Sequence, residues 1–487
     1  MDRMYDATSI STPAVCAAVL WGLACTADAA TIHVPADFAD IQSAVDAAAD
    51  GDVILVAPGT WTGTGQSAVD IFGKSITLRA TGSAAETILD GEGTRRVIAL
   101  RMGFDTESHV IDGFTITNGR SDTRFGARGP EGGGVYCSGH DLLVKNCIFS
   151  NNLTTDNGGG LYMDWSDAII VNCTFTGNTA GRTLTENLEG PYTFGGAIYG
   201  HHSDVTVTDC LIDGNSASGG GGILLTRDSA LHINTSRIRS NAAINGGGIH
   251  MHISTLHMVE CIVSSNATWG LWGLGGQGGG VFIDDSPSEI TNTTFQYNTS
   301  MDGGGLYFNR STCELSGCTV SDSHASRNGV GLYAYEGAVT ISDCTLTRNT
   351  AASADPQFVT GGGVYLSGGH HAIRNSSISH HTGFLTGGGI NCSADSSSTL
   401  SLSDTLLCDN GDDPINGNYT DEGGNELLAG CASECYDVTG DTRVSTDDLL
   451  SLLLVLGTTD AEHDFDHTGR VDIRDLMLLL LTWGGCG

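Results

Sequence analysis

A short glycine motif that recurs along most of the chain constrains the fold more than any other feature. It is a glycine triplet, or a near variant of one, followed by a step in which apolar residues flank a variable residue that is often aromatic. The ten copies are GGGVYC at 132–137, GGGLYM at 158–163, GGAIYG at 195–200, GGILLT at 221–226, GGGIHM at 246–251, GGGVFI at 278–283, GGGLYF at 303–308, GVGLYA at 329–334, GGGVYL at 361–366 and GGGINC at 387–392. Such repetition predicts a solenoid, because each unit can bury its apolar side only against its neighbours.

The spacing of the copies indicates what one repeat builds. Most copies are 25 or 26 residues apart, with one spacing of 37 and two of 32. Each unit contains three steps in which apolar residues alternate with others, and this alternation is typical of strands with one buried face. One unit therefore predicts one turn of a parallel β-helix with three short strands, and successive turns stack about 4.8 Å apart.

Two polar columns follow from stacking the units. Six cysteines share one slot: Cys147, Cys173, Cys210, Cys261, Cys318 and Cys344. Serine or threonine fills the same slot in other units, so a small buried slot is favoured over disulfides or metal ligation. Most units also close on an asparagine, which predicts a ladder of side chains bonded to neighbouring backbone at a tight turn.

The N-terminal part resembles a known family. Residues 31–60 read as strand, helix and strand, with Asp37 as the expected helix cap, and resemble the N-terminal cap of pectin-lyase-like right-handed parallel β-helices. The phrases SITLRATG, TILDG and VIDGFTITNG at 75–119 are similar to first coils of that family, and the glycine repeats also resemble polymorphic outer-membrane protein repeats. The resemblance implies an all-β, right-handed parallel β-helix over 30–430, with a capping helix and regular coils at 132–408.

The first strand of each unit carries the candidate binding residues. After the glycines, one outward position is mostly aromatic, and the next outward position holds carboxylates, imidazoles and amides. The candidates are Tyr136, Tyr162, Asp164, Tyr199, His201, His252, Asp284, Tyr307, Asn309 and Tyr333. Together with Trp269 and Trp272 in an insertion on the same edge, they predict a surface for an extended sugar chain. The alternative is that the rings only stack on one another.

Residues 435–487 are predicted to form a separate calcium-binding module. Two loop-helix units, 437–457 and 464–484, lie 27 residues apart. A 12-residue calcium loop takes oxygen ligands from positions 1, 3, 5, 7, 9 and 12. The candidate ligands are Asp437, Thr439, Asp441, the carbonyl of Arg443, Ser445 and Asp448 in the first loop, and Asp464, Asp466, Thr468, the carbonyl of Arg470, Asp472 and Asp475 in the second.

The doubled pattern resembles dockerin modules. That resemblance implies Ca²⁺, an EF-hand-like pair of loop-helix units, and a cohesin-like or other surface protein as partner. The helices are more apolar than the resemblance implies, so packing on the β-helix or on another module stays open. Because the two ends of a dockerin lie together, Cys435 and Cys486 are expected to form a disulfide, with Cys408 and Cys431 as the second pair.

Composition and the N-terminal segment bear on location and partners. The apolar run at 14–25, followed by Ala27 and Ala29 at a small-x-small site, predicts a signal peptide over 1–29 and a secreted or cell-surface protein. Later apolar runs are too short to span a membrane. The net charge of −35 makes nucleic acid an unfavourable partner.

Two functions remain open from the sequence. The first is binding of extracellular polysaccharide along the aromatic and polar face. The alternative is a polysaccharide lyase or glycosidase acting on that face, with Arg227 and Arg310 as the nearest basic candidates. No catalytic motif matches, so the catalytic residues stay unassigned.

Overall fold

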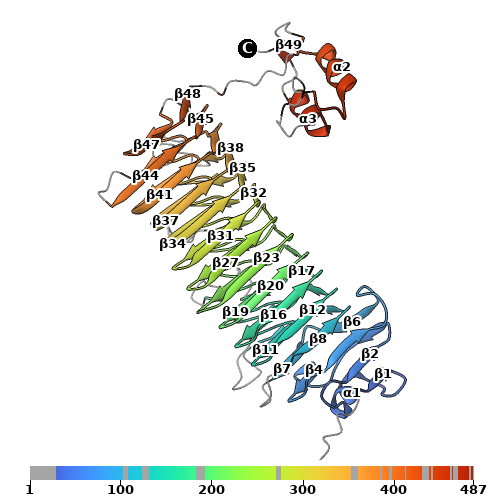
Figure 1. Ribbon diagram of the computed structural model, residues 1–487. Coiled ribbons are helices and arrows are strands. Elements are labelled where there is room, and N and C mark those ends of the chain that lie inside the picture. The colour runs from blue at the N-terminus through green and yellow to red at the C-terminus, as the bar shows by residue number, and fades with distance from the viewer. Residues whose placement is uncertain are drawn as a thin grey trace, which may run out of the picture.

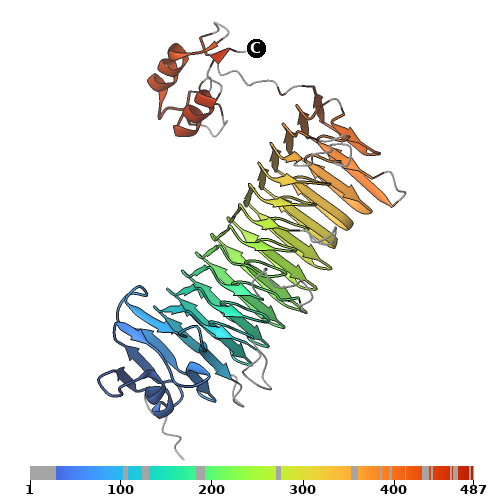
Figure 2. The same ribbon diagram turned by 180° about the vertical axis from the view of Figure 1, so that it is seen from behind.

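Stacked parallel strands make up most of the chain in the computed structural model (Figure 1). The structure describes residues 29–101, 108–122, 131–181, 192–269, 276–351, 360–383, 386–393, 397–411, 413–429, 431, 438–439, 443–460, 463, 465, 470–481 and 484–485. Both views show an elongated solenoid with two short helices set apart from its C-terminal end (Figure 2). The predicted signal peptide lies almost entirely outside the described residues.

Three strands recur in each regular coil, as the repeat predicts. The first strands follow the glycines and are β11 (Val135–Ser138), β15 (Leu161–Asp164), β19 (Ile198–His201), β22 (Ile223–Thr226), β26 (Ile249–His252), β30 (Val281–Asp284), β34 (Leu306–Ser316), β37 (Leu332–Ser342), β40 (Val364–Ser367) and β43 (Ile390–Cys392). The second strands are β12 (Leu142–Lys145), β16 (Ala168–Val171), β20 (Asp204–Thr208), β23 (Ala230–Asn234), β27 (Thr255–Val259), β31 (Pro287–Thr291), β41 (Gly369–Arg374) and β44 (Ser398–Ser403), while β34 and β37 continue through both positions. The third strands are β13 (Ile148–Ser150), β17 (Thr174–Thr176), β21 (Leu211–Asp213), β24 (Arg237–Arg239), β28 (Ile262–Ser264), β32 (Thr294–Gln296), β35 (Thr319–Ser321), β38 (Thr345–Thr347), β42 (Ser377–Ser379) and β45 (Leu406–Cys408).

A fourth strand of two residues adds to the predicted three. It lies between the closing asparagine and the next glycines, as β10 (Arg120–Ser121), β14 (Leu153–Thr154), β18 (Thr179–Ala180), β25 (Ala242–Ala243), β29 (Ala267–Thr268), β33 (Thr299–Ser300), β36 (His324–Ala325) and β39 (Thr350–Ala351). Two residues are too few to show the alternation that marks a strand in sequence.

The coils stack in register, so equivalent residues form columns. In β15 and β19, for example, Tyr162 pairs with Tyr199 and Asp164 with His201. The inward column is a dry core in which Phe149 stacks on Phe175 with ring centroids 4.4 Å apart. Each such fully buried side chain contributes about 1.5–3 kcal/mol.

The glycine triplet is required by close backbone approach. The first glycine of the copy at 158–163, Gly158, has a φ of +69°, and a Cβ there would lie 2.7 Å from Cβ of Tyr162. A Cβ on Gly159 would lie 2.4 Å from the carbonyl oxygen of Gly196 in the next coil. No other residue fits both positions without displacing backbone.

The asparagine ladder is buried and continuous. Asn215 donates through Nδ2 to the Asn241 Oδ1 at 3.0 Å, and its own Oδ1 accepts from the backbone N–H of Asn178 at 2.9 Å. It also donates to the carbonyl of Phe175 at 3.0 Å. The ladder runs through Asn152, Asn178, Asn215, Asn241, Asn266 and Asn298. Near the C-terminal end His381 takes the same place, receiving the N–H of Asn349 at 3.1 Å.

The six column cysteines are buried thiols, as predicted. Their sulfurs lie within a ladder in which, for example, the N–H of Cys173 donates to Sγ of Cys210 at 3.4 Å. The predicted bridge between Cys408 and Cys431 is formed. Cys435 and Cys486 lie outside the described residues, so that pairing stays a prediction.

A helix covers the first coils at the N-terminal end. This helix, α1 (Ile41–Ala47), buries Ile41, Ala44 and Val45 against the strands. Its cap is Asp40, whose side chain accepts from the N–H of Ser43, and not Asp37 as the sequence suggested. Asp37 instead accepts the N–H of His33 at 2.7 Å. The strands of this region are β1 (Thr31–Val34), β2 (Val53–Val56), β3 (Gly59–Trp61), β4 (Ser67–Phe72), β5 (Thr77–Ala80), β6 (Thr87–Asp90), β7 (Arg96–Arg101), β8 (His109–Asp112) and β9 (Thr115–Thr117).

The C-terminal end carries short strands and the helix pair. The last coil contains β46 (Ile415–Asn416), β47 (Thr420–Gly423) and β48 (Glu426–Leu428). The helix pair is α2 (Thr446–Val455) and α3 (Ile473–Leu481). Strand β49 (Arg443–Val444) precedes α2, β50 (Gly484–Gly485) follows α3, and the two strands pair antiparallel. Val444, Leu452, Val471 and Leu479 form a small core of their own. Within the described ranges, no helix has the length and apolar character needed to cross a membrane.

Candidate functional site

Three outward columns run along the edge where the first strands end. The ring column consists of Tyr136, Tyr162, Tyr199, Leu224, His250, Phe282, Tyr307, Tyr333 and Tyr365. The polar column, two residues further on, consists of Ser138, Asp164, His201, Thr226, His252, Asp284, Asn309, Tyr335 and Ser367. The corner column follows directly and consists of Gly139, Trp165, His202, Arg227, Ile253, Asp285, Arg310, Glu336 and Gly368. We call the polar and corner columns together the polar strip.

The ring column is largely covered. Tyr199 and Tyr307 expose only 7% and 8% of their surface. Ring faces pack on each other, with centroids 5.3 Å apart for Tyr136 and Tyr162 and 4.6 Å apart for Tyr307 and Tyr333. The predicted tyrosines therefore stack along the solenoid, and what they can offer a ligand is an edge or a hydroxyl, not an open face.

Burial also makes these tyrosines unsuitable as general bases near neutral pH. It raises the pKa of Tyr199 to about 12, and it raises the pKa of Tyr162, Tyr307 and Tyr333 as well. A phenol with a raised pKa keeps its proton and acts as a hydrogen-bond donor near neutral pH.

The polar column brings two of the candidate residues, Asp164 and His201, together. Nδ1 of His201 lies 2.7 Å from Oδ1 of Asp164, and the two side chains come from β19 and β15. A carboxylate accepts a hydrogen bond from Nδ1–H, so it favours the tautomer in which Nε2 carries the lone pair. The pair is half-buried at the surface of the strip.

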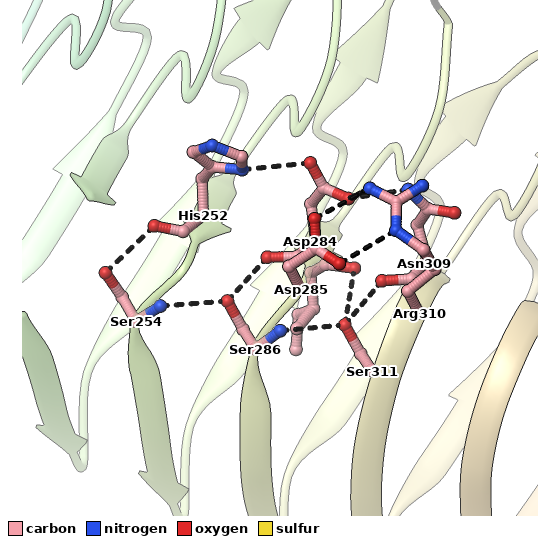
Figure 3. A network of polar contacts seen from close by, with 9 residues as sticks. His252, Ser254, Asp284, Asp285, Ser286, Asn309, Arg310 and Ser311 are labelled. Carbon is pink, nitrogen blue, oxygen red and sulfur yellow. Dashed lines mark hydrogen bonds and ion pairs between the residues drawn. The ribbon is translucent and has the colours of Figure 1, made fainter. Parts of the chain in front are cut away.

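A second pair joins His252 and Asp284 (Figure 3). Nδ1 of His252 lies 2.9 Å from Oδ2 of Asp284, and Asn309 donates to the other carboxylate oxygen. The order of the two pairs is mirrored along the column: Asp164 and His201 come first, then Thr226, then His252 and Asp284. The two imidazoles are thus two coils apart, about 9.6 Å at strand spacing.

An ion pair on the corner column borders the second pair. Arg310 donates from Nε and Nη2 to the two oxygens of Asp285 at 2.8 and 2.7 Å. These hydrogen bonds hold the pKa of Asp285 below its ordinary value. His252, Asp284 and Asp285 also place one possible metal-ligating atom each within 4.8 Å of one another.

The sequence named Arg227 and Arg310 as basic candidates but did not show that they belong to a corner column. Trp165 is 65% exposed and stacks on His202 with ring centroids 4.1 Å apart, and His202 in turn lies 4.3 Å from the ring of His201. Trp165 and His202 have φ values of 52° and 48°, in the left-handed region. This exposed indole is the open aromatic face that the covered tyrosines do not provide.

A serine that follows five of the nine corner residues was the available signal. Ser166, Ser203, Ser254, Ser286 and Ser311 follow five of the corner residues. The N–H of Ser286 donates to Oγ of Ser311 at 3.1 Å, and the N–H of Ser166 to Oγ of Ser203 at 3.1 Å. These bonds fix the backbone at the turn and leave the preceding corner side chain free to project.

The insertions predicted to flank the strip lie only partly within the described residues. Trp269 is half-buried, whereas Trp272 lies outside the described residues, as do the interiors of the insertions at 182–191, 270–275 and 352–359. The predicted residues form two clusters, around Asp164 and around Asp284, and between them the ring column holds Leu224, His250 and Phe282 in place of tyrosine.

The predicted calcium loops are described in part. Asp448 accepts from N–H and Oγ1 of Thr439, both at 2.9 Å, and from the N–H of Ser445 at 2.8 Å. Although burial acts in the opposite direction, these bonds lower the pKa of Asp448 to about 2. Asp475, the equivalent residue 27 positions later, is also fully buried. These hydrogen bonds satisfy the buried carboxylate of Asp448, which forms the capping box of α2 with Ser445.

The other predicted calcium ligands are described only in part. Arg443 lies in β49 opposite Gly485, and the N–H of Asp472 donates to Asp475 at 2.7 Å. Arg470 begins the described segment that leads into α3. The candidates outside the described residues are Asp437, Asp441, Asp464, Asp466 and Thr468.

Comparison with known proteins supports the fold. The family model described as "Right handed beta helix region" matches residues 103–279 and 279–426. Among solved structures, the chain is similar to the A-module of a mannuronan C-5 epimerase from Azotobacter vinelandii, at 12% identity over 80% of this chain and 93% of that one, with a TM-score of 0.34. It is also similar to a family 28 exopolygalacturonase from Yersinia enterocolitica (10% identity, 82% and 78% covered, TM-score 0.33) and to the tailspike receptor-binding domain of Siphovirus 9NA (12%, 85% and 81%, 0.34). No curated protein matches the chain. At these identities and TM-scores the solved structures carry no argument about activity.

Proposed function

The chain belongs to the right handed beta helix family, and on that basis we propose that it is an exported protein that binds extracellular polysaccharide along the polar strip. One observation carries the proposal. Exposed Trp165 and Tyr335, the latter 38% exposed, bracket the strip six coil steps apart, about 29 Å at strand spacing.

The side chains between the two aromatics suit a sugar chain. Each intervening coil presents a hydroxyl, an imidazole, a carboxylate, an amide or a guanidinium, as His201, Thr226, His252, Asp284 and Asn309 with their corner neighbours. Sugar recognition combines stacking on an aromatic face with directed hydrogen bonds. The spacing between strands of neighbouring coils is comparable to the length of one pyranose ring. An extended glycan could therefore meet equivalent positions in successive coils.

The test is glycan binding by the full chain with matched aromatic variants. Trp165→Ala removes the open indole and is expected to weaken binding about tenfold, close to 1.4 kcal/mol. Tyr297→Ala is the control, because Tyr297 is 54% exposed, also has a left-handed φ, and lies on another edge. A glycan array first identifies the ligand, and calorimetry then compares the variants. Equal loss in both variants, or no glycan bound by the parent protein, would contradict the proposal.

A second candidate function rests on the two histidine-carboxylate pairs. In each pair the carboxylate orients one imidazole, which is the arrangement that general acid and base groups require. Cleavage by a lyase would transfer the proton of the carbon next to the uronate carboxyl to one imidazole, while the glycosidic oxygen leaves with a proton from an acid. A glycosidase would add water across the same bond.

Activity separates this candidate from binding alone. Polyuronates and neutral glycans are incubated with the full chain, and unsaturated product is followed by ultraviolet absorbance and reducing ends by colour. Activity that falls at least about a hundredfold in His201→Ala or His252→Ala, but not in the exposed off-strip control His232→Ala, would support catalysis. Glycan binding without product would leave the protein as a binding module.

The C-terminal residues 435–487 are proposed to act as a calcium-stabilised docking module. Two observations support this: the equivalent buried carboxylates Asp448 and Asp475, and exposed apolar side chains on both helices, such as Leu454 at 78% and Ile473 at 64%. The dockerin resemblance suggests a cohesin-like or other surface protein as partner. Ca²⁺ titration of the full chain, with Asp448→Asn as the variant, tests the metal, and an unchanged thermal unfolding curve on adding Ca²⁺ would contradict it.

A further inference from the structure

We propose that His252, Asp284 and Asp285 form a binding site for a divalent transition-metal ion on the polar strip, and that Arg310 closes this site when the ion is absent. The three ligands come from the ends of β26 and β30 in adjacent coils, and one donor atom from each lies within 4.8 Å of the others. In Figure 3 the imidazole and the two carboxylates converge on one side of the strip.

The geometry of the first two ligands already suits one ion. Nδ1 of His252 and Oδ2 of Asp284 are 2.9 Å apart. Two neighbouring ligands, each about 2.1 Å from one ion and at a right angle, are separated by about the same distance. A metal could therefore replace the shared proton without moving either backbone.

The backbone beneath the ligands is held in place independently of them. Oγ of Ser286 donates to the carbonyl oxygen of Asp284 at 2.6 Å, and the N–H of Ser286 donates to Oγ of Ser311. Oγ of Ser311 donates in turn to the carbonyl of Asn309 at 2.7 Å. Because these serine bonds fix the corner, Asp285 and Arg310 project from defined positions.

Arg310 supplies the positive charge that the carboxylates otherwise lack. It contacts both oxygens of Asp285, and its Nη2 lies 3.3 Å from Oδ1 of Asp284. Its side chain is 47% exposed, so it can turn into solvent without disturbing the core. Exposed ion pairs are weak, and a metal ion that contacts both carboxylates and the imidazole can displace the guanidinium.

The ligand set selects the class of metal. One imidazole nitrogen with carboxylate oxygens suits Zn²⁺, Co²⁺ or Mn²⁺, whereas Ca²⁺ prefers six to eight oxygens. Water would complete the coordination shell. At the mirrored pair Asp164 and His201, the corner residue His202 stacks on Trp165, and no third donor atom lies close enough to the pair among the described residues. That pair is therefore a matched control.

The test uses the full chain stripped of metal, with Co²⁺ as a visible probe and Zn²⁺ measured by calorimetry. Saturating Ca²⁺ is present throughout to occupy oxygen sites in the C-terminal module. The parent chain is expected to bind one Co²⁺ with an absorption band typical of nitrogen and oxygen ligands. His252→Ala and Asp284→Asn are expected to weaken binding at least about tenfold, while His201→Ala leaves it unchanged.

Arg310→Ala is the decisive variant. It removes the competing charge and leaves all three ligands, so it should tighten Zn²⁺ binding by up to about fivefold. Thermal unfolding of each variant checks that the solenoid is intact. Loss of affinity in Arg310→Ala, unchanged affinity in His252→Ala, or no stoichiometric metal in the parent chain would overturn the proposal. No glycan is present, so this result is independent of the proposed polysaccharide binding.

Discussion

The asparagine ladder and the polar column have the same coil spacing but opposite character. The ladder is buried and nearly uniform, with each amide bonded to the next and to backbone. The polar column is partly exposed and holds a different residue in almost every coil. Uniformity is expected where every coil has the same backbone groups to satisfy, and variety where the side chains face solvent or a ligand. This contrast distinguishes the structural ladder from the column proposed to bind a ligand.

The largest effect is expected from breaking the ladder. Asn215→Ala leaves the carbonyl of Phe175 and the N–H of Asn178 buried without their partner, at about 1–3 kcal/mol each. We expect the free energy of unfolding to fall by about 3 kcal/mol in denaturant titration. Asn309→Ala, on the polar column, is the matched control and should change the free energy of unfolding by less than about 1 kcal/mol. Equal losses would remove the distinction between the columns.

The next effect concerns the one histidine within the ladder. Burial lowers the pKa of His381 to about 3, whereas an unfolded histidine titrates near 6.5. The unfolded chain therefore binds more protons between these values, and the contribution of neutral His381 to stability is full above about pH 6.5 and is lost as the pH falls toward 3.

The variant His381→Asn restores the common ladder residue and removes this pH dependence. Its stability relative to the parent is expected to improve as the pH falls, by up to about 1.4 kcal/mol per pH unit below 6.5. Urea titrations at pH 7, 6 and 5 measure the difference. A constant difference over this range would show that His381 does not resist protonation in the folded state.

A smaller effect is expected in the cysteine column. Serine occupies the equivalent slot at Ser236, where its hydroxyl accepts the N–H of Cys210 at 3.0 Å. Cys173→Ser should therefore change the free energy of unfolding by no more than about 1 kcal/mol. Because Cys173 is buried, thiol titration with and without denaturant checks that the column is inaccessible in the folded parent. Rapid reaction of the folded protein would contradict this.

The smallest effect is expected at a corner of the polar strip. Ile253 is 46% exposed and has a φ of +50°, which is unfavourable for a β-branched residue. Ile253→Asn should raise the free energy of unfolding by about 0.5 kcal/mol, because asparagine tolerates this conformation. A loss of stability would mean that Ile253 makes contacts worth more than the backbone strain.

The fold could be predicted from the repeat because its evidence is redundant. Most coils repeat the glycines, the alternation and the buried asparagine, and the close backbone approach that requires glycine at Gly158 and Gly159 recurs in other coils. The capping aspartate was misassigned because Asp37 and Asp40 are both suitable residues, and only the backbone shows which one precedes the helix.

The candidate site could be predicted only as columns. Alternation along the strand identified Asp164, His201 and Asp284, but not which of their neighbours would be covered. The glycine turns lie close to the tyrosines, since a Cβ on Gly158 would clash with Cβ of Tyr162, and neighbouring rings cover one another. Trp165 was missed because corner residues follow no hydrophobic pattern. Arg310 was named as a basic candidate, but its pairing with Asp285 depends on register between coils.

The in-register stacking has a consequence for how this surface can change. Only a whole coil can be inserted or deleted without breaking the register, so the distance between the two imidazole pairs can change only by whole coil spacings. Removing the coil that carries Thr226 would bring His201 directly beside His252. Duplication or deletion of one repeat would therefore lengthen or shorten the strip by one sugar-sized step while preserving the core. The number of coils therefore sets the length of the polar strip.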